Sequence, residues 1–247
     1  MDGKNYRIFG IELIGTYALV LFSAGLVCIN EITTPRAWHQ PGLAGIALGQ
    51  GLILAAMLAL TAPITGGYLN PAIVVMQWVF NRVETPRAGW LLGAQCLGSA
   101  MAGLSLYFTF DPAVLQNALY GAPHINIMAY PESGQRTQFT GALLELVLTF
   151  FLVFAIFGLA EGADALRLGL VAGMIMTVCA LFGLPLTGAA LNPARWLGPT
   201  LLQAYSSSRA AWTDSLVYLA GPILGALAGG FFVFKVYQPA LAEKSPS

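Results

Sequence analysis

Two asparagines, Asn70 and Asn192, stand in nearly the same local sequence, GGYLNPAIVV at 66–75 and GAALNPARWL at 188–197. Asparagine is a favoured helix N-cap, and proline is favoured at the first helical position, where its missing N–H would be unpaired anyway. Each Asn-Pro-Ala triplet therefore predicts the start of a helix. The side-chain amides of the two asparagines can donate hydrogen bonds to a passing oxygen, which is recognition chemistry without bond making. The triplets are Asn70, Pro71 and Ala72, and Asn192, Pro193 and Ala194.

Three ionisable side chains, Glu12, Glu145 and Arg195, fall within apolar segments, where a charge needs a partner. No nucleophile, base or group of metal ligands converges with them, so the sequence predicts no enzyme, no cofactor and no metal site. The cysteines lack the spacing of a zinc site or a disulfide framework. They are Cys28, Cys96 and Cys179. Equal numbers of basic and acidic residues, 11 of each, argue against a nucleic-acid partner.

The composition places these groups in a lipid bilayer. Of the 247 residues, 57% are hydrophobic and only 9% are charged, whereas a soluble domain has about 25% charged residues. A bilayer core about 30 Å thick requires roughly 20 apolar helical residues. Two apolar segments, 70–79 and 192–202, are too short to span it and predict re-entrant half-helices. The six segments that are long enough are 6–29, 42–60, 88–110, 138–160, 166–183 and 212–236.

The chain contains an internal duplication. The stretch PITGGYLNPA at 63–72 matches PLTGAALNPA at 185–194 in seven of ten residues, and Glu-Leu-x-x-Thr recurs from Glu12 and from Glu145. Each copy holds three spanning helices, an odd number, so the second copy must enter the membrane with opposite polarity. We therefore predict an all-α membrane protein with an inverted repeat. We expect a single domain, 1–247, with repeat halves at 6–120 and 138–237.

The two half-helices are predicted to meet near the bilayer midplane, because ten residues at 1.5 Å rise reach about 15 Å. Their N-termini bring two partial positive charges together, which disfavours a cation and suits a neutral hydrogen-bonding molecule. Glycines spaced four apart predict close helix packing rather than a site. They are Gly45 and Gly49, Gly169 and Gly173, and Gly221, Gly225 and Gly229.

The distribution of basic residues predicts that both termini are cytoplasmic, with the plasma (inner) membrane as the expected location. Seven basic residues fall on the side of the termini and three on the other side. The seven are Lys4, Arg7, Arg82, Arg87, Arg167, Lys235 and Lys244, and the three are Arg36, Arg136 and Arg209.

The paired Asn-Pro-Ala motifs, the arginine directly after the second one and the repeated Glu-Leu-x-x-Thr resemble the major intrinsic protein family, the aquaporins and aquaglyceroporins. The resemblance covers about residues 6–237. It implies a bundle of six transmembrane helices plus two re-entrant half-helices, and a homotetramer in which each subunit has its own pore. It also implies that Arg195 lines an outer constriction, and that Glu12 and Glu145 hold the re-entrant loops in place.

The resemblance assigns the remaining filter positions to Gln50, Ala180 and Ala189. Water-selective members typically have a bulky aromatic residue and a histidine at the first two. Two alanines leave a wide opening and Gln50 offers both a donor and an acceptor, so we expect passage of water and of larger polyols, urea or metalloid hydroxides. Trp196 departs from the aspartate usual in glycerol facilitators. Tyr218 resembles the pattern of the water channels, whereas Leu219 resembles that of the glycerol facilitators. This mixture of the two patterns is similar to the plant nodulin-like branch.

Three alternatives stay open from the sequence. A strictly water-selective channel has the same motifs. A coupled secondary transporter also uses inverted repeats and broken helices, although it would usually need more titratable groups near the midplane. A closed member of the same fold is the third, because the segment 111–138 is long enough to cover the mouth of a pore.

Overall fold

Six long apolar helices dominate the computed structural model, which describes residues 3–32, 40–129, 135–159, 164–206 and 212–243. Each of the six is long and apolar enough to cross a membrane. They correspond to the six predicted spans. Their bounds are α1 (Gly3–Asn30), α2 (Gly42–Thr65), α4 (Thr85–Thr109), α6 (Gln135–Phe157), α7 (Ala165–Thr187) and α9 (Ser215–Phe232).

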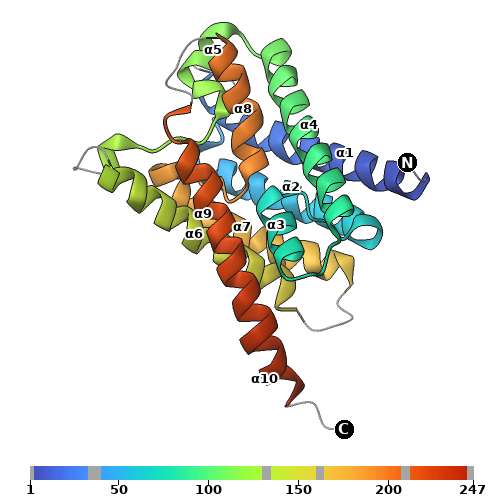
Figure 1. The fold of residues 1–247 in the computed structure, drawn as a ribbon. Coiled ribbons are helices and arrows are strands. Elements are labelled where there is room, and N and C mark those ends of the chain that lie inside the picture. Colours follow the sequence, from blue (N-terminus) through green and yellow to red (C-terminus); the bar gives the residue numbers. More distant parts are fainter. Residues whose placement is uncertain (1–2, 33–39, 130–134, 160–163, 207–211, 244–247) are drawn as a thin grey trace.

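Several short elements complete the part of the chain that the structure describes. The helix α9 continues through the π-helical turn η4 (Val233–Tyr237) into α10 (Gln238–Ala242), which projects beyond the other helices (Figure 1). Between α4 and α6 lie α5 (Pro112–Asn117) and two 3₁₀ turns, η1 (Leu119–Gly121) and η2 (Ile127–Ala129).

The two predicted half-helices are α3 (Pro71–Val79) and α8 (Pro193–Ser206). Both begin at the proline that follows the asparagine, as the capping argument predicts. The helix α8 runs to Ser206, four residues past the predicted end at 202, and Pro199 lies inside it without ending it.

The helices α2 and α7 run past their predicted ends. Both continue through a proline, Pro63 in α2 and Pro185 in α7, and end at glycines in the left-handed conformation, Gly66 (φ 100°) and Gly188 (φ 77°). The predicted spans ended at 60 and 183, before these prolines, which usually break a helix interior. Here each proline removes only one hydrogen bond, close to the helix end, and a left-handed glycine completes the C-cap.

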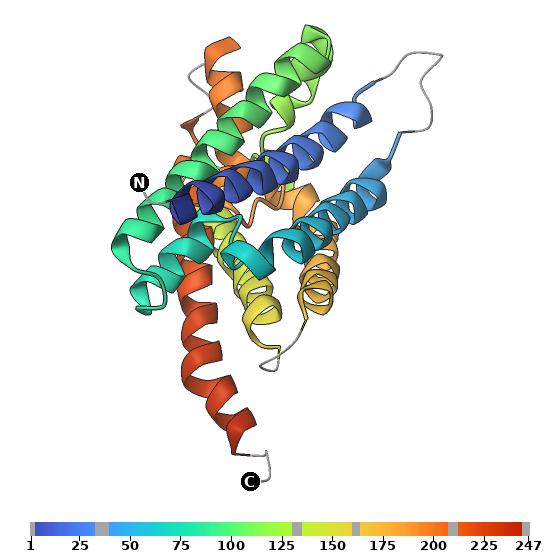
Figure 2. The ribbon, with the colours of Figure 1, turned by 90° about the vertical axis from the view of Figure 1, so that its right-hand side faces the viewer.

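The order of elements is the same in the two halves: two long helices, a half-helix and a third long helix. Within the halves, α1 packs on α4 and α6 packs on α9, whereas α2 and α7 form the main contact between the halves. Figure 2 shows α1 lying between α2 and α4. The half-helices sit inside this frame, with α3 against α4 and α9, and α8 against α4 and α1.

Glycines allow the long helices to approach closely. A Cβ atom placed on Gly173 of α7 would lie 2.5 Å from the carbonyl oxygen of Gly51 in α2, and one on Gly221 of α9 would lie 2.8 Å from the oxygen of Ala142 in α6. The packing role predicted for these two glycines is confirmed. For Gly45, the only contact that its Cβ would make within the described residues is with the ring of Pro41, at the start of its own helix, so its predicted role stays a prediction.

We predict that Gly173→Ala lowers the free energy of unfolding by about 1–3 kcal/mol, the usual cost of overpacking. The added methyl group would force α2 and α7 apart where backbone faces backbone. Thermal unfolding of the purified protein in detergent measures this loss. Gly10→Ala is the matched control, because a Cβ there meets no other described residue within 4 Å. Equal stability of the two variants would contradict the prediction.

Candidate functional site

The two asparagines cap the half-helices. Asn70 has an extended backbone (φ −151°), and its side-chain oxygen accepts a hydrogen bond from the N–H of Ala72 at 2.9 Å. The oxygen of Asn192 accepts from the N–H of Ala194 at the same distance. Each cap satisfies one of the N–H groups that a helix start leaves unpaired.

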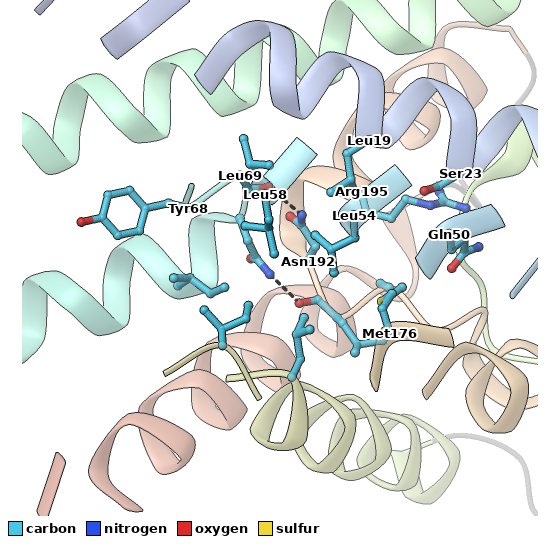
Figure 3. Close-up of a pocket in the computed structure, with 16 residues that line it drawn as sticks. Leu19, Ser23, Gln50, Leu54, Leu58, Tyr68, Leu69, Met176, Asn192 and Arg195 are labelled. Carbon is cyan, nitrogen blue, oxygen red and sulfur yellow. Dashed lines mark hydrogen bonds between the residues drawn. The ribbon is translucent and has the colours of Figure 1, made fainter. Parts of the chain in front are cut away.

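The amide nitrogens of the same asparagines form hydrogen bonds with the other half of the chain. The Nδ2 group of Asn70 donates to the carbonyl oxygen of Leu191 at 2.9 Å, and that of Asn192 donates to the oxygen of Leu69 at 2.9 Å (Figure 3). These bonds bring the two helix starts together. Since an amide carries two N–H bonds, each asparagine keeps one more donor.

Glu12 holds the loop before α3. Its Oε1 atom accepts from the hydroxyl of Thr65 at 2.6 Å and from the N–H of Tyr68 at 3.1 Å, and its Oε2 atom accepts from the N–H of Leu69 and from Nε2 of Gln95, both at 2.9 Å. The carboxylate is fully buried. Four donors around one buried acidic group offset its loss of water.

Glu145 does the same for the loop before α8. Its Oε1 atom accepts from the hydroxyl of Thr187 at 2.7 Å and from the N–H of Ala190 at 3.0 Å, and its Oε2 atom accepts from the N–H of Leu191 at 2.8 Å. It is also fully buried. The two loops are thus held by equivalent carboxylates, in agreement with the repeat.

Both loops contain left-handed backbone at residues other than glycine. Leu69 (φ 50°) and Leu191 (φ 52°) directly precede the asparagines, and Ala189 has φ 45°. This conformation is uncommon for such residues and persists only when the surroundings enforce it. Here the carboxylates enforce it, and the carbonyls of Leu69 and Leu191 accept the crossed hydrogen bonds.

A narrow central cavity lies beside the two helix starts and is lined by Asn70 and Asn192. Its volume is about 20 Å³, and roughly 10–15 Å³ is the least that holds one water molecule. Most of the wall is aliphatic, from residues such as Leu54, Ile73 and Met176. The side chains with polar groups on this wall are Ser23, Gln50, Tyr68, Asn70, Asn192 and Arg195. An apolar wall with a few hydrogen-bonding groups suits single-file passage of small polar molecules.

Arg195 lies at the junction between the central cavity and a wider, open cavity of about 340 Å³. Its Nη1 group donates to the carbonyl oxygen of Gly121 at 2.8 Å, and its buried Nε atom has no hydrogen-bond partner among the described residues. Residues Gly121 to His124 form part of the wall of the open cavity. The segment between α4 and α6 therefore anchors the arginine and shapes the approach to it.

Gln50 lies at the same end of the central cavity. Its amide is buried, and neither its nitrogen nor its oxygen has a hydrogen-bond partner within the described part of the chain. Figure 3 shows Gln50 and Ser23 at the end where the Arg195 guanidinium lies. Buried polar atoms usually have a hydrogen-bond partner. An amide on a cavity wall without a partner in the described protein therefore indicates that a molecule in the cavity, such as water, binds there.

Two of the predicted filter residues do not line the central cavity. Ala180 and Ala189 are fully buried in the hydrophobic core, and neither is on the wall of the central or the open cavity. Ala190 is on the wall instead. The structure thus brings together Gln50, Arg195 and both asparagines. Sequence reasoning missed Ser23, Tyr68 and Ala190; the last two stand at equivalent positions of the repeat, which was an available signal.

Trp196 is on the wall of neither cavity. Its ring stacks on that of Tyr218 (centroids 6.0 Å apart, interplanar angle 22°) and meets the edge of Trp212 at 5.6 Å. The hydroxyl of Tyr218 donates to the carbonyl oxygen of Thr187 at 2.6 Å, at the end of α7. Trp196 therefore braces the loop before α8 from behind and does not narrow the cavity.

Comparisons with known proteins agree with this architecture. The family model for the major intrinsic protein matches residues 2–233. Aquaporin NIP1-2 of Oryza sativa subsp. japonica is 32% identical over 232 residues, covering 92% of this chain and 70% of that protein. Aquaporin-4 of Bos taurus is 33% identical over 203 residues, covering 81% and 58% respectively.

Among solved structures, the aquaglyceroporin from Plasmodium falciparum superposes with a TM-score of 0.83, covering 97% of this chain and 99% of that one. At 22% identity this likeness concerns the fold. The family model supplies the assignment, since it spans nearly the whole chain. The chain belongs to the major intrinsic protein family.

Proposed function

We propose that the central cavity is the pore of a passive channel for water and small uncharged solutes, such as glycerol-like polyols, urea or metalloid hydroxides. The observation that carries this proposal is the buried amide of Gln50, which lines the cavity together with Arg195 and has no hydrogen-bond partner among the described residues. It offers a donor and an acceptor to a hydroxyl-bearing molecule, without a charge to hold an ion.

The family assigns the coarser activity. Its members are channels rather than enzymes, so the chain is an integral membrane protein that forms a passive transmembrane channel. We infer the finer selectivity from the wall of the cavity, because pore width and the hydrogen-bonding groups that line it determine what passes.

We attribute the exclusion of cations and protons to fixed positive charge at two places along the pore. Asn70 and Asn192 mark two helix N-termini that face one another across the crossed hydrogen bonds, and each carries a partial positive charge. Arg195 adds a full positive charge at the junction with the open cavity. A neutral molecule accepts hydrogen bonds there, whereas a cation is repelled.

The filter in this proposal consists of Gln50, Ala180, Ala189 and Arg195. Gln50 and Arg195 contact the permeating molecule. Ala180 and Ala189 act through their small size, because no large side chain at these positions reaches the wall of the cavity. A narrow cavity of about 20 Å³ also fits a strictly water-selective channel, which is the second candidate.

We propose that both termini lie in the cytoplasm of a plasma (inner) membrane, and that four copies form a tetramer with one pore each. The open cavity beside Arg195 would then face the outside. This orientation rests on the distribution of Lys and Arg, of which Arg36, Arg209 and Lys244 lie outside the described residues.

Stopped-flow light scattering on proteoliposomes tests the proposed selectivity. We expect water, glycerol and urea to enter faster than in empty liposomes, with no proton or cation current in a conductance measurement. Fast water flux with glycerol flux no higher than in empty liposomes would reject the wider selectivity and favour a strict water channel. A measurable cation current would contradict the role given to the helix N-termini and Arg195.

A bulky aromatic residue in place of Ala180 should reduce glycerol flux more than water flux. Ala180 is fully buried in the core cluster that also contains Leu54 and Met176 of the cavity wall, so we expect the phenyl ring of Ala180→Phe to push this wall into the pore. Leu181→Phe is the matched control, because Leu181 is 40% exposed on the outer surface of the same helix. Equal loss of both fluxes in Ala180→Phe would remove Ala180 from the filter.

A further inference from the structure

Tyr68 occupies the end of the central cavity opposite the filter. It lines the same cavity as Gln50 and Arg195, and Figure 3 shows it at the far end, with its hydroxyl directed away from the other labelled residues. It is the bulkiest side chain on the half of the wall that comes from the loop before α3. The filter described above does not use it.

The duplication shows what a different residue does at the equivalent place. Tyr68 and Ala190 each stand two residues before a capping asparagine, and both line the cavity. Their backbones are held alike, because the N–H of Tyr68 donates to Glu12 at 3.1 Å and the N–H of Ala190 donates to Glu145 at 3.0 Å. The two equivalent positions on the cavity wall therefore differ in the side chain: a methyl group at Ala190 and a phenol ring at Tyr68.

The ring of Tyr68 is fixed by its surroundings. It packs against the main core cluster, which includes Leu58 and Ile73, and against a second cluster that includes Ile8 and Leu91. These contacts come from both sides of the loop. The ring is thus part of the pore wall rather than a freely rotating side chain.

Gly66 makes room for this ring. A Cβ atom on Gly66 would lie 2.9 Å from Cζ of Tyr68, and Gly66 also has the left-handed φ of 100° that ends α2. The loop is therefore shaped so that the phenol ring fits beneath the helix end.

We propose that Tyr68 is a specificity-determining residue that forms the size-limiting constriction of the pore, at the end opposite the open cavity. This inference rests on the proposed function, since it assumes that the central cavity conducts. The end with Gln50 and Arg195 admits a solute through hydrogen bonds. At the other end, Tyr68 excludes by size the larger solutes that have entered. Bulk rather than the hydroxyl sets this limit, because the hydroxyl points out of the narrow part.

The test measures size cut-offs of full-length variants in proteoliposomes, with water, glycerol and a five-carbon polyol as probes. Tyr68→Ala and Tyr68→Leu should raise the ratio of glycerol to water permeability severalfold and admit the larger polyol. Tyr68→Phe should behave as the wild type, because it keeps the ring. Tyr68→Trp enlarges the ring and should reduce glycerol flux more than water flux.

Tyr6→Ala is the matched control, since it removes a tyrosine that is 63% exposed near the start of α1. Elution from a size-exclusion column in detergent identifies the folded variants. If the folded members of the Ala, Leu and Trp series keep the wild-type cut-off and flux ratio, Tyr68 is not the constriction. A wild type that passes no glycerol would reject the proposed selectivity alone, because Tyr68 is assessed by the change between wild type and variant.

Discussion

Replacing Glu145 with alanine should abolish water and solute flux and strongly destabilise the protein. The substitution leaves three donors without their acceptor: the Thr187 hydroxyl and the N–H groups of Ala190 and Leu191. An unpaired buried donor costs about 1–3 kcal/mol, so the total loss should be at least about 3 kcal/mol. The loop would leave its left-handed conformation, and Asn192 would no longer be aligned with its partner across the pore.

Thermal unfolding in detergent and stopped-flow water flux, normalised to reconstituted protein, measure the two effects. Glu145→Gln should fall between the wild type and Glu145→Ala, because it keeps one acceptor oxygen but turns the other position into a donor. Glu84→Ala is the control for loss of a carboxylate, since Glu84 is exposed and its side chain does not cap α4. Wild-type flux in Glu145→Ala would show that the loop is held by other contacts.

Replacing Trp196 with alanine should have the second largest effect, lowering the free energy of unfolding by about 3–5 kcal/mol through the cavity it leaves. The side chain is only 2% exposed and packs between Tyr218 and Trp212. Its removal takes away the ring that stacks on Tyr218. The hydroxyl of Tyr218 donates a hydrogen bond to the carbonyl oxygen of Thr187. The loop before α8 should loosen, so the glycerol-to-water flux ratio should also change.

Two further variants separate packing from hydrogen bonding. Trp196→Phe keeps an aromatic ring against Tyr218 and should retain most of the stability. Tyr218→Phe keeps the stack but loses the hydroxyl, so it should alter the flux ratio with a smaller loss of stability. If Trp196→Ala unfolds at the same temperature as Trp196→Phe, the aromatic stack does not brace the loop.

The fold was largely predictable because its determinants are local. Hydropathy and length predicted the six spans, and the capping preference of Asn70 and Asn192 predicted both half-helices. The helix ends were less predictable. Pro63 and Pro185 would stop most helices, yet here a left-handed glycine close behind each proline completes the helix end.

The candidate site was predictable where a residue type alone carries the chemistry. Glu12, Glu145 and Arg195 are expensive in an apolar segment and therefore had to be partnered or functional. The direction of Trp196 was not predictable, because it depends on how α8 is rotated against α9. Tyr68 was overlooked for a related reason: an aromatic residue in an apolar stretch is equally at home in the core, in lipid or on a pore.

The crossed hydrogen bonds between the asparagines also bear on the order in which the protein is built. The carbonyl of Leu69 receives its partner from Asn192, which the ribosome adds more than a hundred residues later. Until then, the loop before α3 can form its hydrogen bonds with Glu12, but the carbonyl oxygen of Leu69 lacks the donor that Asn192 supplies. The centre of the pore is consequently completed only when both halves have been inserted and α2 meets α7, which makes channel activity depend on both halves being in place.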